Sequence, residues 1–257
     1  LRQEREIEDE ESYQISLNFN KKFDNEGHEL DTEFQYSEDS ELAPTIIRED
    51  VIDGEDQFIP DESVIESEDQ TEYLLQADYV RPMGEAQFEA GFRINLENTV
   101  EPFFRQFETE ENEVQIDTIL TNNFEFDENV YAVYAQYGNK YGDFSFLLGL
   151  RYEYTQLEGQ TTSEYDLSVF EDLLGEDVDL NFDNRFDGLF PTLNLIYEIG
   201  EEENITLGYN RRINRPRGWF LNPTPSLSSR TNVFQGNPSL RPAFANAFDL
   251  GYLKRWG

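Results

Sequence analysis

Nine segments of this sequence alternate apolar and polar residues with a period of two, and turns centred on glycine separate them at an almost constant interval. Such alternation is typical of β-strands that present two different faces. The short turns centre on Gly27, Gly84, Gly142 and Gly200, which lie 57, 58 and 58 residues apart, and Gly257 follows after a further 57. The segments are YQISLNF, LDTEFQY, EYLLQADYV, QFEAGFRINLE, VYAVYAQYG, FSFLLGLRYEY, LFPTLNLIYEI, ITLGYNRR and FDLGY.

Each interval between short turns holds a strand, a long polar connection and another strand. The long connections run over roughly 38–70, 99–127, 158–184 and 215–241, and the first three are acidic. Tight turns at one end of a meander and long loops at the other are typical of outer-membrane β-barrels. One face of the strands carries Phe, Tyr, Leu and Val, which suit lipid, and the other carries Arg, Glu, Gln, Asn and Gly, which suit a wet lumen. We therefore expect an all-β, transmembrane, antiparallel up-and-down barrel fragment of about nine strands.

Composition excludes several other classes of protein. The chain has 55 acidic and 19 basic residues, a formal charge of −36, which argues against binding nucleic acid through its phosphates. It has no cysteine and therefore no disulfide framework. No apolar run reaches the ~18 residues of a membrane helix. Aromatic residues make up 14% of the chain and sit at alternating positions, which opposes disorder.

Two soluble folds share parts of this pattern. A β-propeller also repeats, but its blades take roughly 40–50 residues and four strands, and each interval here holds two convincing strands. A β-sandwich alternates as well, but its strands usually have about five or six residues. A soluble propeller or sandwich that binds carbohydrate remains the alternative fold, and it predicts a protein that needs no detergent.

One stretch has a composition unlike the rest of the chain. Residues 209–242 hold six arginines, and no carboxylate occurs between Glu203 and Asp249. We favour a structural role, in which these arginines pair with acids of the barrel wall such as Glu153. The functional alternative is capture of an anionic ligand, because arginine binds carboxylate and phosphate in a bidentate manner. Trp219 and Phe220 either stack on a sugar or an aromatic siderophore or pack within the loop. The candidate ligand-binding residues are Arg212, Arg215, Arg217, Trp219, Phe220 and Arg230.

Motifs in the same stretch resemble the barrel region of TonB-dependent receptors of the Bacteroidetes type, in the outer-membrane β-barrel family. The runs RRINRP, LNP and GNPSLRP carry the resemblance, and residues 17–30 and 74–93 are also similar to that family. The motif residues, for which we expect a structural role, are Arg211, Arg212, Asn214, Arg215, Pro216, Asn222, Pro223, Gly236, Asn237, Pro238, Leu240 and Pro242.

The resemblance implies an intact barrel of 22 strands in the outer membrane of a Gram-negative bacterium, with an N-terminal plug and a segment that couples to the TonB complex. Residues 1–257 would be part of a single barrel domain, without the plug or a signal peptide. The implied function is import of a nutrient such as an iron chelate, an oligosaccharide or a peptide. A plain porin-like barrel or an outer-membrane enzyme is the alternative. We expect the fragment to misfold alone, because an open sheet has two free edges.

Nothing in the sequence indicates covalent catalysis, a metal or a cofactor. Residues 38–72 are rich in Asp and Glu, yet neither DGED at 53–56 nor DNRFDG at 183–188 has the ligand spacing of an EF-hand. His28 is the single histidine, and one histidine without cysteine makes no zinc site. We therefore predict no metal ligand and no enzyme activity.

Overall fold

The computed structural model describes residues 2–51, 58–165, 179–200, 202–229 and 232–255. In these residues, eleven antiparallel strands form one curved sheet and two short ones form a separate hairpin. The strands of the sheet are β1 (Arg2–Glu6), β2 (Asp9–Lys22), β3 (Glu29–Glu49), β4 (Glu62–Met83), β5 (Ala86–Glu108), β6 (Val114–Ile116), β7 (Asn122–Tyr141), β8 (Phe144–Thr162), β9 (Asn181–Gly200), β10 (Glu203–Asn214) and β13 (Ala243–Lys254).

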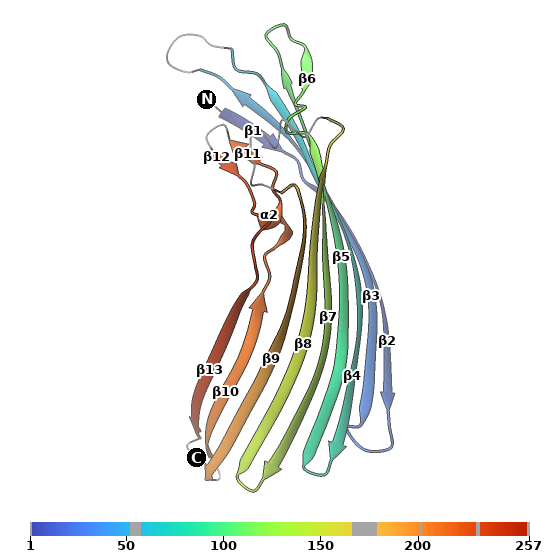
Figure 1. The fold of residues 1–257 in the computed structure, drawn as a ribbon, viewed down its shortest axis with the longest axis vertical. Coiled ribbons are helices and arrows are strands. Elements are labelled where there is room, and N and C mark those ends of the chain that lie inside the picture. Colours follow the sequence, from blue (N-terminus) through green and yellow to red (C-terminus); the bar gives the residue numbers. More distant parts are fainter. Residues whose placement is uncertain (1, 52–57, 166–178, 201, 230–231, 256–257) are drawn as a thin grey trace.

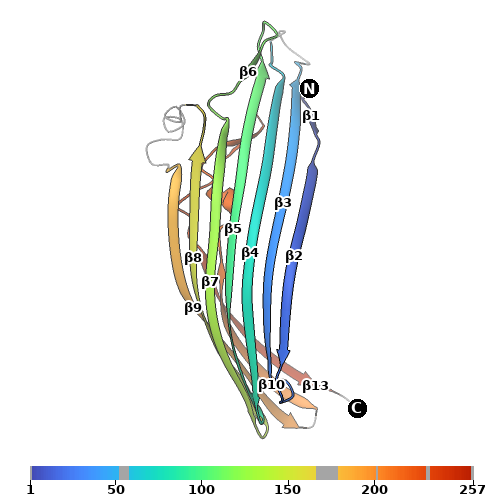
Figure 2. The ribbon, with the colours of Figure 1, turned by 90° about the vertical axis from the view of Figure 1, so that its right-hand side faces the viewer.

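The order of the strands is that of a meander. The path β3-β4-β5-β7-β8-β9-β10-β13 follows the chain, β2 pairs with β3, and β1 and β6 add short pairings at the far ends of β3 and β5. The sheet is open, with β2 and β13 at its edges (Figures 1 and 2). These two edge strands and the seven between them are the nine segments that the alternation predicts.

Glycine makes three of the short turns that the sequence predicts, whereas Gly200 is the last residue of β9. Gly257 lies outside the described residues. Gly27, Gly84 and Gly142 have φ values of 73°, 73° and 57°. A side chain strains this left-handed region, and glycine enters it freely. The turns therefore fix the register of each hairpin at one end of the sheet, while the other ends are joined by the longer connections.

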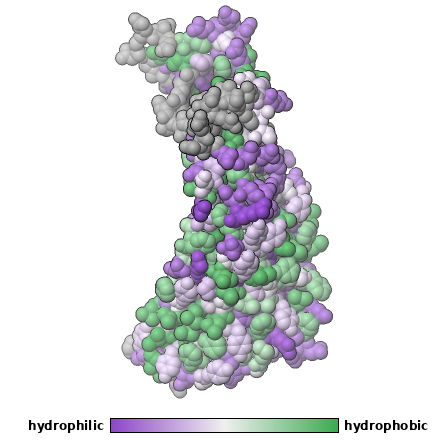
Figure 3. Space-filling view, in the orientation of Figure 1, coloured by the Kyte–Doolittle hydropathy of each residue, from purple (hydrophilic) through white to green (hydrophobic). Residues whose placement is uncertain are grey.

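The convex face carries the predicted lipid-facing residues. Tyr36 pairs with Tyr73, and Tyr131 pairs with Tyr154, so that tyrosines lie side by side across neighbouring strands. From these tyrosines to the short turns each strand has about the 9–11 residues that a membrane-crossing strand needs. We call this part the membrane band, and the part beyond the tyrosines the upper half. Hydrophobic residues gather towards the short turns in Figure 3, and the strongest hydrophilic colour lies above them.

The first three long connections are shorter than the sequence suggests. β3, β4, β5, β7, β8 and β9 have 21, 22, 23, 20, 19 and 20 residues, and their ladders continue through most of 38–49, 62–70, 99–108 and 158–162. The prediction failed there because the alternation that it used is between a lipid-facing and a polar face. Beyond the membrane band neither face meets lipid, so backbone pairing continues without the apolar period that lipid imposes.

Among the described residues, no helix has the length and apolarity needed to cross a membrane.

Candidate functional site

The connection between β10 and β13 folds back onto the concave face of the sheet in its upper half (Figures 1 and 2). It contains the one-turn helix α2 (Gly218–Leu221) and the hairpin of β11 (Ser226–Ser229) and β12 (Asn232–Phe234). We call residues 215–242 the inward segment. The proline-rich sequence around α2 lacks backbone donors for a regular ladder, which favours this irregular path.

Apolar contacts anchor the inward segment to the wall. Phe124 and Phe126 of β7, Leu157 of β8 and Leu221 of α2 form a cluster in which no side chain is more than 2% exposed. Partly buried side chains packed against it are Phe182, Phe186 and Leu240. The sequence predicts a polar concave face, and this cluster corrects that prediction for the upper half. Burial here comes from the folded-back chain, which strand alternation cannot reveal.

Arg215 ties the start of the inward segment to two strands of the wall. Its guanidinium donates to the carboxylate of Glu153, to Thr155 Oγ1 at 3.0 Å, and lies 3.8 Å from Glu128 Oε1. Both Arg215 and Glu153 are largely buried, with side-chain exposures of 20% and 11%. Glu153 is the carboxylate that the sequence analysis names as a partner for this stretch.

The GNP motif joins the two ends of the inward segment. The backbone N–H of Gly236 donates to the Asn222 carbonyl at 2.9 Å, and that of Asn237 donates to the Phe220 carbonyl at 2.7 Å. A Cβ at position 236 would lie 2.5 Å from the first of these oxygens, so glycine is required by close approach of two backbones. Pro238 is buried, and its carbonyl accepts from Asn184 Nδ2 at 2.7 Å. These contacts support a structural role for the motif.

The other predicted arginines do not gather at one point. Arg211 lies over the Phe244 ring at 4.7 Å and donates to the Leu189 carbonyl, while Arg212 is exposed and donates to Asn210 Oδ1 at 2.9 Å. Arg217 is also exposed. Arg230 lies outside the described residues. An anion site built from several of these arginines is therefore not assembled in the described part of the chain.

The two aromatic candidates sit beside each other on the inward segment. The rings of Trp219 and Phe220 stack with centres 3.6 Å apart, and Phe234 approaches Trp219 at 5.1 Å. All three side chains are at least 40% exposed, so they keep free surface for a ligand. No motif or periodic pattern in the sequence indicates that Phe234 belongs with these two residues.

A cavity of about 330 Å³ lies between the inward segment and the upper wall, and we call it the acidic pocket. The wall contributes residues of β1, β3, β4, β5 and β7, and the inward segment contributes aromatic and polar side chains. The lining residues are Glu6, Glu41, Ala43, Glu66, Ser67, Glu68, Glu101, Pro102, Phe103, Asn122, Trp219, Asn222, Thr224, Pro225 and Phe234. No sequence motif pointed to its glutamates. Extending the alternation of β4 from Gln76 towards the N-terminus would nevertheless have placed Glu66 and Glu68 on the concave face.

The surroundings of three carboxyl groups in the acidic pocket disfavour their charged form. Partial enclosure raises the pKa of Glu66, Glu68 and Glu101 above the usual glutamate value, and repulsion by nearby carboxylates adds to the effect. Asn222 Nδ2 donates to Glu101 Oε2 at 3.0 Å, which opposes the rise in the pKa of Glu101. The pocket is therefore a region of concentrated negative potential.

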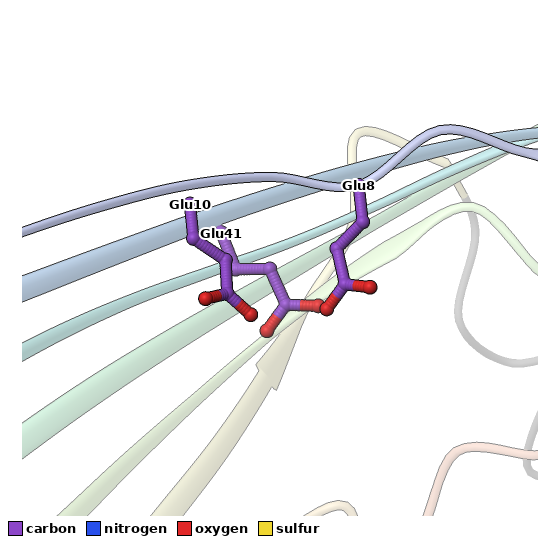
Figure 4. Close-up of side chains that lie close together, drawn as sticks. All are labelled: Glu8, Glu10 and Glu41. Atoms are coloured by element: carbon purple, nitrogen blue, oxygen red, sulfur yellow. The ribbon is translucent and has the colours of Figure 1, made fainter.

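Glu41, which also lines the acidic pocket, meets two further carboxylates near the edge of the sheet. Oxygen atoms of Glu8, Glu10 and Glu41 lie within 4.8 Å of one another (Figure 4). Glu8 and Glu10 are exposed, and exposed acids commonly cluster without a metal. Three neighbouring acids alone do not make a calcium site, so the prediction of no metal ligand stays a prediction.

Comparison with known proteins identifies a family and a fold. A family model described as "Outer membrane protein beta-barrel family" matches residues 21–257. No curated protein matches the sequence. The ferric citrate transporter FecA in its unliganded form is similar in structure, with a TM-score of 0.52 and 11% identity over 82% of this chain and 28% of that chain.

Two other receptors are similar at lower scores. The alcaligin outer membrane receptor FauA from Bordetella pertussis has a TM-score of 0.38 and 8% identity, over 95% of this chain and 40% of that chain. BauA, the ferric preacinetobactin receptor from Acinetobacter baumannii, has a TM-score of 0.36 and 10% identity, over 95% and 44%. The chain thus spans well under half the length of each of these three proteins.

Proposed function

This chain belongs to the outer membrane protein β-barrel family, and from that premise we propose that it forms part of the barrel wall of a TonB-dependent receptor, which binds a nutrient and imports it. Family membership places it in the outer membrane of a Gram-negative bacterium. We assign its convex face to lipid because that face carries the exposed apolar and aromatic residues. The continuous meander, in which six strands have 19 to 23 residues, excludes the four-stranded blades of a propeller. The RRINRP and GNPSLRP motifs favour a receptor of the Bacteroidetes type.

The observation that carries the proposal is the inward segment, which occupies the concave face in place of open water. A plain porin keeps a polar, water-filled lumen. Here an apolar cluster, the Arg215–Glu153 ion pair and backbone hydrogen bonds fix a folded segment against the wall and enclose the acidic pocket beneath it. A lined cavity above the membrane band suits selective capture of a ligand before transport, and free diffusion would not need it.

The ligand is a scarce or large nutrient, such as an iron chelate, an oligosaccharide or a peptide, and the partner that supplies energy is the TonB complex. The family match and the similar receptors give no support for an enzyme, and we propose no catalytic residue. We assign Trp219 and Phe220 to the ligand surface because they are exposed beside the pocket. We assign Arg215 and the GNP motif to holding the inward segment in place.

The test is uptake by cells that carry or lack the gene for the full-length protein, under iron limitation and with glycan or peptide as the sole carbon source. We expect one nutrient to require the gene, and its uptake to stop on loss of TonB or on addition of a protonophore. Binding of that nutrient to isolated outer membranes should persist without energy. Uptake that continues in the absence of TonB and proton-motive force would instead establish a porin, and chemical conversion of the nutrient by purified protein would establish an enzyme.

A further inference from the structure

The acidic pocket carries an excess of negative charge that the protein neutralises only in part. Glu66, Glu68 and Glu101 line it, and no lysine or arginine belongs to its lining among the residues that the structure describes. Of the nearby arginines, Arg105 pairs with Glu62 and Asp117, and Arg215 pairs with Glu153 below the pocket. Arg217 lines the neighbouring cavity with Glu68 and Glu101 and offsets part of their charge, so three glutamates against one arginine leave a net negative charge.

Two of these carboxylates lack partners in the described chain. Glu66 and Glu68 make no side-chain hydrogen bond or ion pair with a described residue, and Glu41 stands directly opposite Glu68 in the ladder of β3 and β4. Like charges directly opposite each other destabilise a sheet. A cation placed among them would relieve this repulsion, so the charge pattern favours a positively charged occupant.

A buried acceptor gives an independent indication. Asn122 lines the pocket from the concave face of β7 and is only 7% exposed. Its Nδ2 donates to the Leu120 carbonyl at 2.7 Å, while its Oδ1 has no hydrogen-bond partner. Buried polar atoms are nearly always satisfied. A donor from outside the chain, either a water molecule or an N–H group of a ligand, would satisfy this acceptor.

The opposite wall of the pocket is aromatic. Trp219 and Phe234 line it with ring centres 5.1 Å apart. Ammonium and guanidinium groups are attracted to the faces of such rings, and tryptophan is the best of them. Carboxylates on one side and indole on the other fit an organic cation better than a bare divalent metal ion, which would need oxygen ligands all round.

We propose that the acidic pocket recognises a protonated amine or guanidinium group on the imported ligand, with Glu66, Glu68 and Glu101 neutralising its charge, Asn122 Oδ1 accepting from it, and Trp219 covering its apolar part. This inference rests on the proposed function for the statement that a ligand enters from the upper half. The ligand class is a basic peptide or an amine-bearing chelate. It differs from the anionic ligand that the arginine-rich stretch alone would suggest.

The test uses purified full-length protein in detergent and three dansylated peptides, Lys-Phe-Lys, Gln-Phe-Gln and Glu-Phe-Glu, each amidated at its C-terminus. Fluorescence anisotropy reports binding. We expect the lysine peptide to bind about tenfold more tightly than the glutamine peptide, as for a partly desolvated charge pair. Glu68→Gln and Glu101→Gln should each weaken the lysine peptide about fivefold and leave the glutamine peptide unchanged.

Matched variants separate this effect from general charge and from misfolding. Glu111→Gln removes one carboxylate from the exposed turn between β5 and β6 and should change none of the three affinities. Trp219→Leu should weaken both the lysine and the glutamine peptide, and the lysine peptide more, because only its ammonium group is attracted to the ring face. Every variant must first show the heat-dependent gel mobility of a folded barrel, and the proposal is judged on those that do.

Three outcomes overturn the inference. Equal affinity for the lysine and glutamine peptides would show that the charge of the ligand has no role. Tighter binding of the glutamate peptide would show that the arginines, and not the glutamates, bind the ligand. Displacement of the lysine peptide by micromolar Ca²⁺, lost in Glu68→Gln, indicates a metal site instead. The peptide affinities are measured on purified protein without an energy source, so their result does not depend on the result of the import test. Lysine-selective binding with TonB-independent uptake would contradict the proposed function and leave the binding site intact.

Discussion

At the scale of single residues, Arg215 shows how one ion pair sets the position of a whole segment. It follows the last residue of β10, where the ladder to β13 ends, and its side chain crosses to Glu153 on β8. Without Arg215, Glu153 keeps Arg151 of its own strand as a partner but loses its ion pair with the inward segment. Losing one partner of an enclosed pair costs more than the pair itself contributes. The pair therefore penalises every arrangement in which the inward segment leaves the wall.

We predict that Arg215→Ala lowers the free energy of unfolding by about 2 kcal/mol, less than the ~3–5 kcal/mol of a fully buried pair because water still reaches both side chains. The readout is the temperature at which half of the full-length protein loses the gel mobility of the folded barrel. Arg212→Ala, at an exposed position, should stay within about 0.5 kcal/mol of wild type. Equal losses at both arginines would refute a specific role for the pair.

The contacts of a residue could be predicted from the sequence where its neighbours along the chain have an unusual composition. The absence of acids around Arg215 indicated a partner elsewhere, and Glu153 was named because it alternates onto the polar face. The glutamates of the acidic pocket gave no such signal, because they lie among so many other carboxylates that no pair stands out. Their importance comes from enclosure by a segment about 120 residues later in the chain, which one sequence does not disclose.

At the scale of elements, the inward segment depends on close backbone contact. Gly236 packs against the carbonyls of Phe220 and Asn222, so a side chain there would separate the GNP motif from α2. We predict that Gly236→Ala loosens the segment, with about tenfold faster cleavage of residues 215–242 by protease on intact cells, equivalent to roughly 1.4 kcal/mol in opening. Gly200→Ala is the matched control, because a Cβ there has no neighbour within 4 Å. Similar cleavage of both variants would show that the contact is unimportant.

The enclosure of the acidic pocket also predicts a pH dependence. The pKa of Glu101 is higher in the folded protein than in an unfolded chain, chiefly because burial disfavours its charged form. The folded state therefore binds more protons, and closure of the segment strengthens as pH falls from neutral through the raised pKa. The other charged groups near it are Glu6, Glu41, Glu66, Glu68, Glu97, Glu128, Arg215 and Arg217.

Measured as protease resistance of residues 215–242 between pH 7 and pH 5, wild type should become more resistant on acidification, and Glu101→Gln should respond less. Binding of the lysine peptide should change in the opposite direction, because protonation removes the charge that attracts it. If Glu101→Gln follows wild type throughout, the pH response arises from other carboxylates. Protease resistance that rises while peptide binding falls would assign the pH response to the pocket, because the backbone hydrogen bonds of the strands do not titrate.

At the scale of the whole molecule, the open sheet divides the chain into two surfaces with different solvents. Turn spacing and alternation predicted the meander, the nine long strands and the face that meets lipid, since these depend on local periodicity. They did not predict how far the ladders continue or that the concave face would be partly apolar. The ladders continue where neither face of the sheet meets lipid. The concave face is apolar where a segment distant in sequence folds back onto it. Neither cause produces a periodic pattern in the sequence.

The two surfaces can be distinguished at one depth in the membrane band. Leu148 on β8 is half exposed on the convex face, and Gln136 on β7 points to the concave face beside Gly149, the next residue along β8. We predict that Leu148→Arg costs about 2–4 kcal/mol, the penalty for arginine at the bilayer midplane. Gln136→Arg should be tolerated, since Gln136 already donates to Glu89 and arginine can take over that contact. The yield of folded full-length protein in isolated outer membranes measures both effects. Equal loss at the two positions would mean that both faces meet the same environment, which a barrel wall does not allow.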